Sequence, residues 1–238
     1  MGVHCRVDPS RFIRSRRPVF CGLDAAVETT LPRRGICEID TARAREYALL
    51  ATLLSRSPDA QLLSGLVDLR GDASPIGQAH TALAEAARQS SQESGAREYF
   101  DLFSGLNEDA LLPYASHYLT DTLYGRPLAR LRNKLQLLGI MKSADWTEPE
   151  DHAGFLCEIM SNLVSGDISA LPGTDLIFFE EHLAPWIGRF FADLQATKSA
   201  DFYQVVGTLG RTFIEIETEA FELPRERGPS STFYRYTS

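Results

Sequence analysis

The chain has 238 residues, of which 44% are hydrophobic, so it can build the core of one ordinary domain, and no uninterrupted apolar stretch approaches the roughly 18 to 20 residues of a membrane-spanning helix. Residues 1–34 hold seven arginines against three acidic residues, whereas the remainder holds 17 basic and 29 acidic residues, and the net charge is −8. This acidic remainder would repel nucleic acid and favours a cationic partner. We therefore expect the protein neither to bind nucleic acid nor to insert stably into a membrane.

The first 38 residues are predicted to form an Arg-rich flexible leader, because they show no sustained periodicity. Within them the phrase SRRPVF, residues 15–20, resembles a twin-arginine export motif. Asp24 and Glu28 follow where an export signal needs an uncharged apolar segment, so a disordered leader or an upstream start artefact is favoured over export. A further hypothesis is that SRRPVF docks into an acidic groove of its own or of a neighbouring molecule.

The four cysteines form no CxxC pair, and three of them lie within the first 37 residues, where they could not staple a core together. This usage is typical of a reducing cytoplasm, so we expect a cytoplasmic protein with reduced thiols. A zinc site would have to combine His4, Cys5, Cys21 and Cys37, whose spacings match no compact ligand pattern.

Residues 39–223 are predicted to form one all-α helical-bundle domain of about seven to nine helices, with no internal repeat and no alternating strand. Tyr47, Leu50 and Leu53 recur at helical spacing and predict a first helix over 41–56. Helical segments follow within residues 58–71, 74–91, 94–106 and 128–141, and then over 148–164, 174–196 and 199–222. The helix over 174–196 is expected to bend at Pro185, and a polar tail is expected over 224–238.

An aromatic segment over residues 111–127 breaks the helical pattern. Pro113 prevents a continuous helix, while Tyr114, Tyr118 and Tyr124 need burial or a ligand, so we expect a loop that enters a short helix. Such tyrosines more often belong to a core than to a ligand platform. Beside an acidic helix start, however, they also suit a groove for a peptide with basic and apolar parts.

The phrase TEPEDH, which starts at Thr147, places three carboxylates, a proline and a histidine before an apolar run. Thr147 and Glu150 have the spacing of a capping box, and Pro149 fits the first turn of a helix, so a helix is predicted to start here. Glu148, Glu150 and Asp151 would then lie at the positive end of the helix dipole.

Capping does not explain His152, which shares the apolar stripe of the predicted helix. An imidazole in that position must be paired, and we expect Asp151 or another nearby acid to hold it and raise its pKa. Three roles of His152 stay open: a structural role, a role in recognition, and a role in catalysis or metal binding. A second cluster, Glu180–His182, belongs to no Glu-x-x-His or HExxH motif, and the chain has no GxSxG, phosphate-loop or GxGxxG signature.

Five short segments resemble the TorD/DmsD/NarJ group of redox-enzyme maturation chaperones, over about residues 40–222 and in family order. They are EPEDH from Glu148 to His152, PYASHYL from Pro113 to Leu119, Gly139 with Ile140, HLAPW from His182 to Trp186, and Phe202 with Tyr203. The sequence departs from the family in its leader and in LQLLGI, where the family often has Tyr or Trp.

The resemblance implies a cytoplasmic, non-catalytic chaperone, monomeric or homodimeric, with no cofactor or metal of its own. It implies binding of the twin-arginine signal peptide and the apo-form of a molybdenum or tungsten oxidoreductase, help with cofactor insertion, and prevention of premature export. The peptide-binding residues that it implies are Tyr114, Ser116, Tyr118, Gly139, Glu148, Pro149, Asp151 and His152, and the supporting residues are Glu150, His182, Pro185 and Trp186.

Our hypothesis for the contact is that Glu148, Glu150 and Asp151 attract the two arginines, the aromatic turn buries the apolar segment, and His152 couples the two parts. The alternative is a small helical-bundle enzyme with metal or acid–base chemistry at Glu148, Asp151, His152 and His182. The client stays open among dimethyl sulfoxide, trimethylamine oxide, nitrate and formate enzymes.

Overall fold

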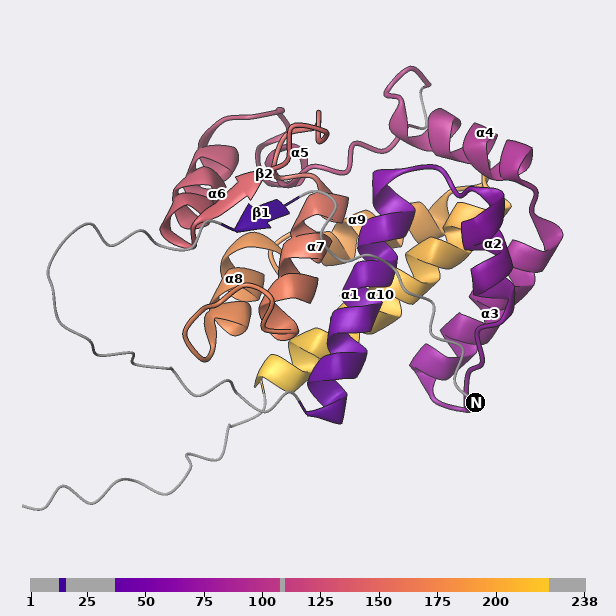
Figure 1. Cartoon of the computed structure of the whole chain (residues 1–238). Coiled ribbons are helices and arrows are strands. Elements are labelled where there is room, and N and C mark those ends of the chain that lie inside the picture. Colours follow the sequence, from indigo (N-terminus) through magenta and orange to yellow (C-terminus); the bar gives the residue numbers. More distant parts are fainter. Residues whose placement is uncertain (1–12, 16–36, 108–109, 223–238) are drawn as a thin grey trace, which may run out of the picture.

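The computed structural model describes residues 13–15, 37–107 and 110–222. These residues form ten α-helices and one two-stranded sheet (Figure 1). In chain order the elements are β1 (Ile13–Ser15), α1 (Glu38–Ser55), α2 (Ala60–Val67), α3 (Pro75–Gln89), α4 (Gln92–Phe103), α5 (Ala115–Thr120), α6 (Arg126–Leu137), β2 (Ile140–Lys142), α7 (Ala153–Val164), α8 (Thr174–His182), α9 (Ile187–Ala196) and α10 (Asp201–Glu222). The predicted all-α class is confirmed, and no described helix is long and apolar enough to cross a membrane.

The described residues hold slightly more helices than the predicted seven to nine, because the helix predicted over 174–196 is two helices. α8 and α9 are separated by a turn that contains Pro185. The N–H groups of Leu183 and Ala184 both donate to the carbonyl of Phe179, each at 2.9 Å, so the helical ladder closes before the chain reaches the proline. The bend expected at Pro185 is therefore a break.

Most of the predicted leader and the whole predicted tail over 224–238 lie outside the described residues, as do His4, Cys5 and Cys21. Cys37 is described and lies directly before α1. Its Sγ accepts a hydrogen bond from the N–H of Asp40 at 3.4 Å and so caps that helix.

α7 is the centre of the fold, because every one of its residues from Ala153 to Val164 is buried. It packs along α1 on one side and also contacts α8 (Figure 1). A helix surrounded in this way needs apolar side chains all round, and residues such as Phe155 and Leu156 provide them. At a polar position the Ser161 hydroxyl donates to the carbonyl of Ala44 at 2.8 Å and links α7 to α1.

α9 and α10 approach each other closely because α10 has glycine at two positions that face α9. A Cβ atom at Gly207 would overlap the backbone of Gln195, and one at Gly210 would overlap the ring of Phe191. The backbone of α10 therefore packs directly against the backbone of α9 at Gly207 and against the Phe191 ring at Gly210. A larger residue at either position would prevent this approach.

α1 and α10 are joined by a buried charged cluster. Arg43 donates to the two carboxylate oxygens of Glu217 at 2.7 and 2.8 Å, and the Tyr47 hydroxyl donates to the same carboxylate at 2.9 Å. The Glu217 side chain is 1% exposed and that of Arg43 is 16% exposed. Every oxygen of the buried carboxylate thus has a donor, which makes this ion pair tolerable inside the protein.

The two short strands are the exception to the expected absence of β-structure. β1 pairs antiparallel with β2, with Ile13 opposite Lys142 and Ser15 opposite Ile140. Three residues are too few to show an alternating pattern, so periodicity could not predict either strand.

α5, α6 and β2 gather at the N-terminal end of α7 (Figure 1). Two backbone hydrogen bonds fix this arrangement: the N–H of Ala115 donates to the carbonyl of Asp151 at 3.0 Å, and the N–H of Ala153 donates to that of Pro113 at 2.7 Å. The segments before α5 and before α7 therefore run together as a short antiparallel bridge. This bridge positions the residues singled out in the sequence.

We expect Glu217→Ala to lower the free energy of unfolding by about 3 kcal/mol, because it leaves Arg43 without its principal partner inside the protein. Urea denaturation of the variant and the wild type measures the difference. Glu215→Ala is the matched control, since it removes a glutamate of the same helix whose ion pair with Arg211 is exposed and should cost less than about 0.5 kcal/mol. Equal losses in the two variants would contradict the structural role of the cluster.

Candidate functional site

The phrase TEPEDH does not start a helix, and the predicted capping box of Thr147 and Glu150 is wrong. α7 begins only at Ala153, with His152 as its N-cap, and its first turn holds no acidic residue. The reason is tertiary: the backbone groups at 151 and 153 are already paired with the segment before α5, and the residues before them form a turn that the N–H of His152 closes onto the carbonyl of Pro149. The carboxylates of the phrase therefore lie in a turn that leads to the helix.

His152 is a buried structural residue at the start of α7. Its Nδ1 accepts a hydrogen bond from the N–H of Gly154 at 3.0 Å, and its ring packs against Tyr114 and Trp146 at centroid distances of 5.3 and 5.4 Å. The side chain is 4% exposed, and burial lowers the pKa of His152 to about 3. The expectation that an acid would raise this pKa is wrong, because Asp151 points to a different partner.

Asp151 connects the start of α7 to α5. It is 1% exposed, and its Oδ2 accepts a hydrogen bond from the backbone N–H of Ser116 at 2.9 Å, in the first turn of α5. The hydroxyl of Ser116 in turn accepts from the N–H of Tyr124 at 3.1 Å. Oδ1 of Asp151 is buried and has no hydrogen-bond partner among the described residues.

Tyr114 and Glu148 form a pair at the surface of the same bridge. The Tyr114 hydroxyl donates to Oε2 of Glu148 at 2.6 Å, and both burial and this carboxylate raise the pKa of Tyr114 well above its usual value. Glu148 is exposed, whereas Tyr114 is half-buried. The pair thus presents a negative charge to solvent beside an aromatic ring.

Glu150 and Tyr118 are engaged elsewhere in the molecule. Both Nε and a terminal nitrogen of Arg132 donate to one oxygen of Glu150, at 2.9 and 2.7 Å, so this carboxylate is neutralised by α6. The Tyr118 hydroxyl donates to Asp193 at 2.9 Å, and its ring packs against Trp186 at 5.6 Å. Tyr118 therefore joins α5 to α9.

The remaining predicted residues have structural surroundings. Gly139 follows α6 with φ +66°, a conformation that favours glycine, and leads into β2. Pro149 accepts a hydrogen bond from the N–H of His152 at 3.2 Å within the turn. Pro185 is exposed between α8 and α9, and the indole of the buried Trp186 donates to the carbonyl of His182 at 2.7 Å.

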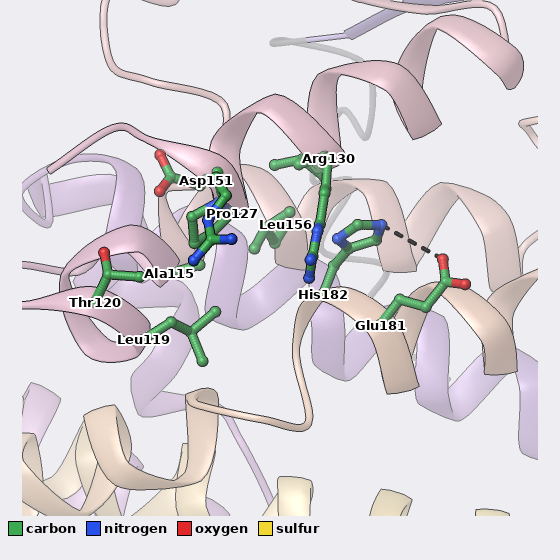
Figure 2. A pocket seen from close by; sticks show the side chains of 11 residues that line it. Ala115, Leu119, Thr120, Pro127, Arg130, Asp151, Leu156, Glu181 and His182 are labelled. Atoms are coloured by element: carbon green, nitrogen blue, oxygen red, sulfur yellow. Dashed lines mark ion pairs between the residues drawn. The ribbon is translucent and has the colours of Figure 1, made fainter. Parts of the chain in front are cut away.

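A pocket with a cavity volume of about 260 Å³ lies beside Asp151, between α5, α6, α7 and α8 (Figure 2). Asp151 lies on one side of it and His182 on the other, with Leu156 between them (Figure 2). Of the predicted site residues, only Asp151 and His182 line this pocket. The other lining residues are Ala115, Leu119, Thr120, Arg126, Pro127, Arg130, Leu131, Leu156 and Glu181.

The charged groups of the pocket are of both signs. Arg126 and Arg130 form no ion pair with the described residues. Glu181, in contrast, forms an ion pair with Nζ of Lys134 at 2.7 Å, and its Oε2 lies 3.6 Å from Nε2 of His182. That distance is too long for a hydrogen bond, and burial lowers the pKa of His182, so the imidazole is mainly neutral at pH 7. Arg126 and Arg130 are one helical turn apart in the sequence, and this spacing is the signal from which the positive side of the pocket could be predicted.

The residues of the alternative enzyme do not converge in this structure. Nδ1 of His152 is occupied by a backbone N–H, Glu148 points to Tyr114, and His182 lies across the pocket from Asp151. Within the described ranges no group of three or more His, Cys, Asp or Glu side chains could hold a metal ion.

Residues 69–192, just over half of the chain, match the family model of the nitrate reductase delta subunit. The chain belongs to this family. The match begins before α3 and ends within α9, so it contains α5, α6, α7 and the pocket. It confirms the resemblance proposed from the sequence.

Several relatives of this member of the nitrate reductase delta subunit family are described as chaperones. The chaperone protein TorD of Aliivibrio fischeri is 27% identical over 142 residues, which cover 56% of this chain and 66% of that protein. A Tat proofreading chaperone, DmsD, of Haemophilus influenzae is 31% identical over 120 residues, or 50% of this chain and 57% of that protein. The matched part thus spans just under two thirds of these relatives or less.

Among solved structures, a redox enzyme maturation protein from Archaeoglobus fulgidus is similar to this family member with a TM-score of 0.49 and 21% identity. The similarity covers 73% of this chain and 93% of that one.

We expect acidification from pH 7 to pH 5 to reduce the stability of the wild type by about 2 kcal/mol more than that of His152→Asn. The unfolded chain takes up a proton on this imidazole below pH 6.5, whereas the folded protein, with a pKa of about 3, does not. The stabilisation is therefore present above pH 6.5 and lost as the pH falls toward 3.

Urea denaturation at several pH values measures this difference. Asparagine is the suitable replacement, because its side-chain oxygen can cap α7 as the imidazole does. It also loses the ring contacts with Tyr114 and Trp146, but that loss does not depend on pH and cancels in the comparison of two pH values. The same loss of stability in both proteins would show that His152 is not held neutral.

Proposed function

We propose that this protein is a cytoplasmic chaperone of redox-enzyme maturation that binds the twin-arginine signal peptide of a molybdenum or tungsten oxidoreductase. Its membership of the nitrate reductase delta subunit family, together with relatives described as chaperones and one as a Tat proofreading chaperone, carries this proposal. In this role the protein catalyses no reaction. It holds the apo-form of its client until the cofactor, which is the client's cargo, has been inserted.

The arginines of the signal peptide are proposed to contact Glu148. This carboxylate is exposed and is held in place by the Tyr114 hydroxyl at 2.6 Å, so it meets a guanidinium without losing the freedom of a mobile side chain. Glu150 contributes less, because Arg132 already occupies it. Asp151 is too deeply buried for a first encounter with a charged peptide.

The apolar part of the signal peptide is proposed to use the pocket and the surface near it. Along the chain from α5 to β2, several large apolar side chains are exposed. They are Leu119, Leu123, Tyr124, Leu137 and Met141. Arg126 and Arg130 at the pocket would repel the peptide's arginines, which favours an apolar side chain there.

The other predicted residues are proposed to act indirectly. Ser116 and His152 fix the bridge that carries Tyr114 and Asp151, while Tyr118 and Trp186 hold α5 against α9. Gly139 and Pro149 shape the backbone at the two ends of the segment that contains β2. None of these contributes charge to the peptide contact.

We expect Glu148→Gln to weaken binding of a peptide with two consecutive arginines and a following leucine-rich segment by about tenfold, since one charge-assisted contact contributes roughly 1.5 kcal/mol. Isothermal titration calorimetry with a synthetic peptide measures the affinity. Glu219→Gln on the exposed side of α10 is the charge-matched control and should bind as the wild type does. If both variants bind equally, Glu148 is not part of the site.

A second experiment tests the apolar contact. We expect Leu119→Asn to weaken binding of the leucine-rich peptide about fivefold, because Leu119 is 39% exposed and lines the pocket. The same substitution should leave the weaker binding of a peptide with serines in place of the leucines unchanged. Equal losses for the two peptides would place the apolar contact away from the pocket.

Purification of the protein from the native host, followed by mass spectrometry of the proteins bound to it, identifies the client.

A further inference from the structure

β2 is a short strand whose edge is occupied by the N-terminal part of the same chain. Ile13–Ser15 pairs with it antiparallel, although residues 16–37 separate β1 from α1, the next helix of the chain. Figure 1 shows β1 lying along β2 beside α6 and near the start of α7. The contact is therefore long-range and is not a hairpin formed by neighbouring residues.

The paired segment directly adjoins the twin-arginine-like sequence of the leader. β1 ends at Ser15, which is also the first residue of SRRPVF, and Ser15 lies opposite Ile140. Residues 1–34 carry an excess of four positive charges, while the rest of the chain is strongly acidic. Charge complementarity thus favours contact of the leader with the body of the protein.

The edge of β2 lies next to the proposed peptide site. The Lys142 side chain donates to the carbonyl of Glu148 at 3.4 Å, so the end of the strand touches the residue proposed to bind arginine. Met141, in the middle of the strand, is 42% exposed, and Gly139 sets the direction of β2 through its positive φ. An extended peptide on this edge would pass directly by the Glu148 pair.

We propose that the edge of β2 is a strand-addition surface for an extended, arginine-containing peptide, and that the chain's own leader occupies it through Ile13–Ser15 as an intramolecular competitor. The inference rests on the proposed function for the identity of the outside peptide. Main-chain hydrogen bonds to the strand supply affinity, and the charges beside it select the sequence.

The balance between the two occupants follows from the size of the pairing. Three residue pairs form a weak contact, so the leader can be displaced. As part of the same chain, however, it acts at an effective concentration set by the connecting residues, and an outside peptide must outcompete it. The full chain should therefore bind such a peptide more weakly than a chain whose leader cannot pair.

The experiment compares three full-length proteins: the wild type, Ile13→Pro/Ser15→Pro, and Thr29→Pro/Thr30→Pro. The first variant disrupts the strand while keeping every arginine, because proline lacks the N–H that a ladder needs. The second places two prolines in the leader outside β1. The probe is a fluorescent peptide of residues 11–20, and a control peptide has prolines in place of Ile13 and Ser15.

We expect the Ile13→Pro/Ser15→Pro protein to bind the probe about tenfold more tightly than the other two proteins, and no protein to bind the control peptide with comparable affinity. Hydrogen exchange of the amides of residues 140–142 should be faster in this variant and slow again when the probe is added. Equal probe affinities in all three proteins, or equal exchange at 140–142, would overturn the inference.

The synthetic twin-arginine peptide described above separates this inference from the proposed function. If it binds the wild type and the Ile13→Pro/Ser15→Pro variant equally, the proposed function stands and competition by the leader is refuted. If it binds none of the proteins while the probe binds the variant more tightly, the strand-addition edge stands and the proposed function fails.

Discussion

The complete burial of α7 is the constraint from which the candidate site follows. The first N–H groups of a helix need acceptors, and those of α7 cannot reach water. Nδ1 of His152 serves Gly154, and the carbonyl of Pro113 serves Ala153. The segment before α5 must therefore lie against the start of α7, and this same contact brings Asp151 to α5 and Tyr114 to Glu148.

Much of the fold could be predicted from local periodicity, whereas the start of its central helix could not. Tyr47, Leu50 and Leu53 identify α1 because the spacing of apolar residues along one helix is a local property of the sequence, whichever elements later bury them. The capping-box spacing of Thr147 and Glu150 competes with hydrogen bonds to residues more than thirty positions away, and the distant partners prevail. The pKa of His152 is likewise lowered and not raised, because the imidazole is buried and the carboxylate of Asp151 is bonded to Ser116.

The side-chain pairings around the candidate site could not be predicted from the sequence. Tyr114 and Glu148 are 34 residues apart, and Ser116 and Asp151 are 35 apart, so no motif spacing contains either contact. Composition indicates an acidic surface, yet Arg132 neutralises Glu150 and Asp151 is used within the fold. The positive side of the pocket, Arg126 and Arg130, follows from the face of α6 and becomes apparent only with its neighbours in place.

The glycines of α10 have a mechanical consequence for the pocket. Because α10 approaches the backbone of α9 at Gly207 and the ring of Phe191 at Gly210, the two helices have little room to shift against each other, and the hydrogen bond of Tyr118 to Asp193 ties α5 to α9. On its side of the pocket, α6 is held to the rest of the described protein by the Arg132–Glu150 and Lys134–Glu181 ion pairs. Ions in solution weaken such partly exposed pairs, so ionic strength sets how firmly α6 closes its side of the cavity.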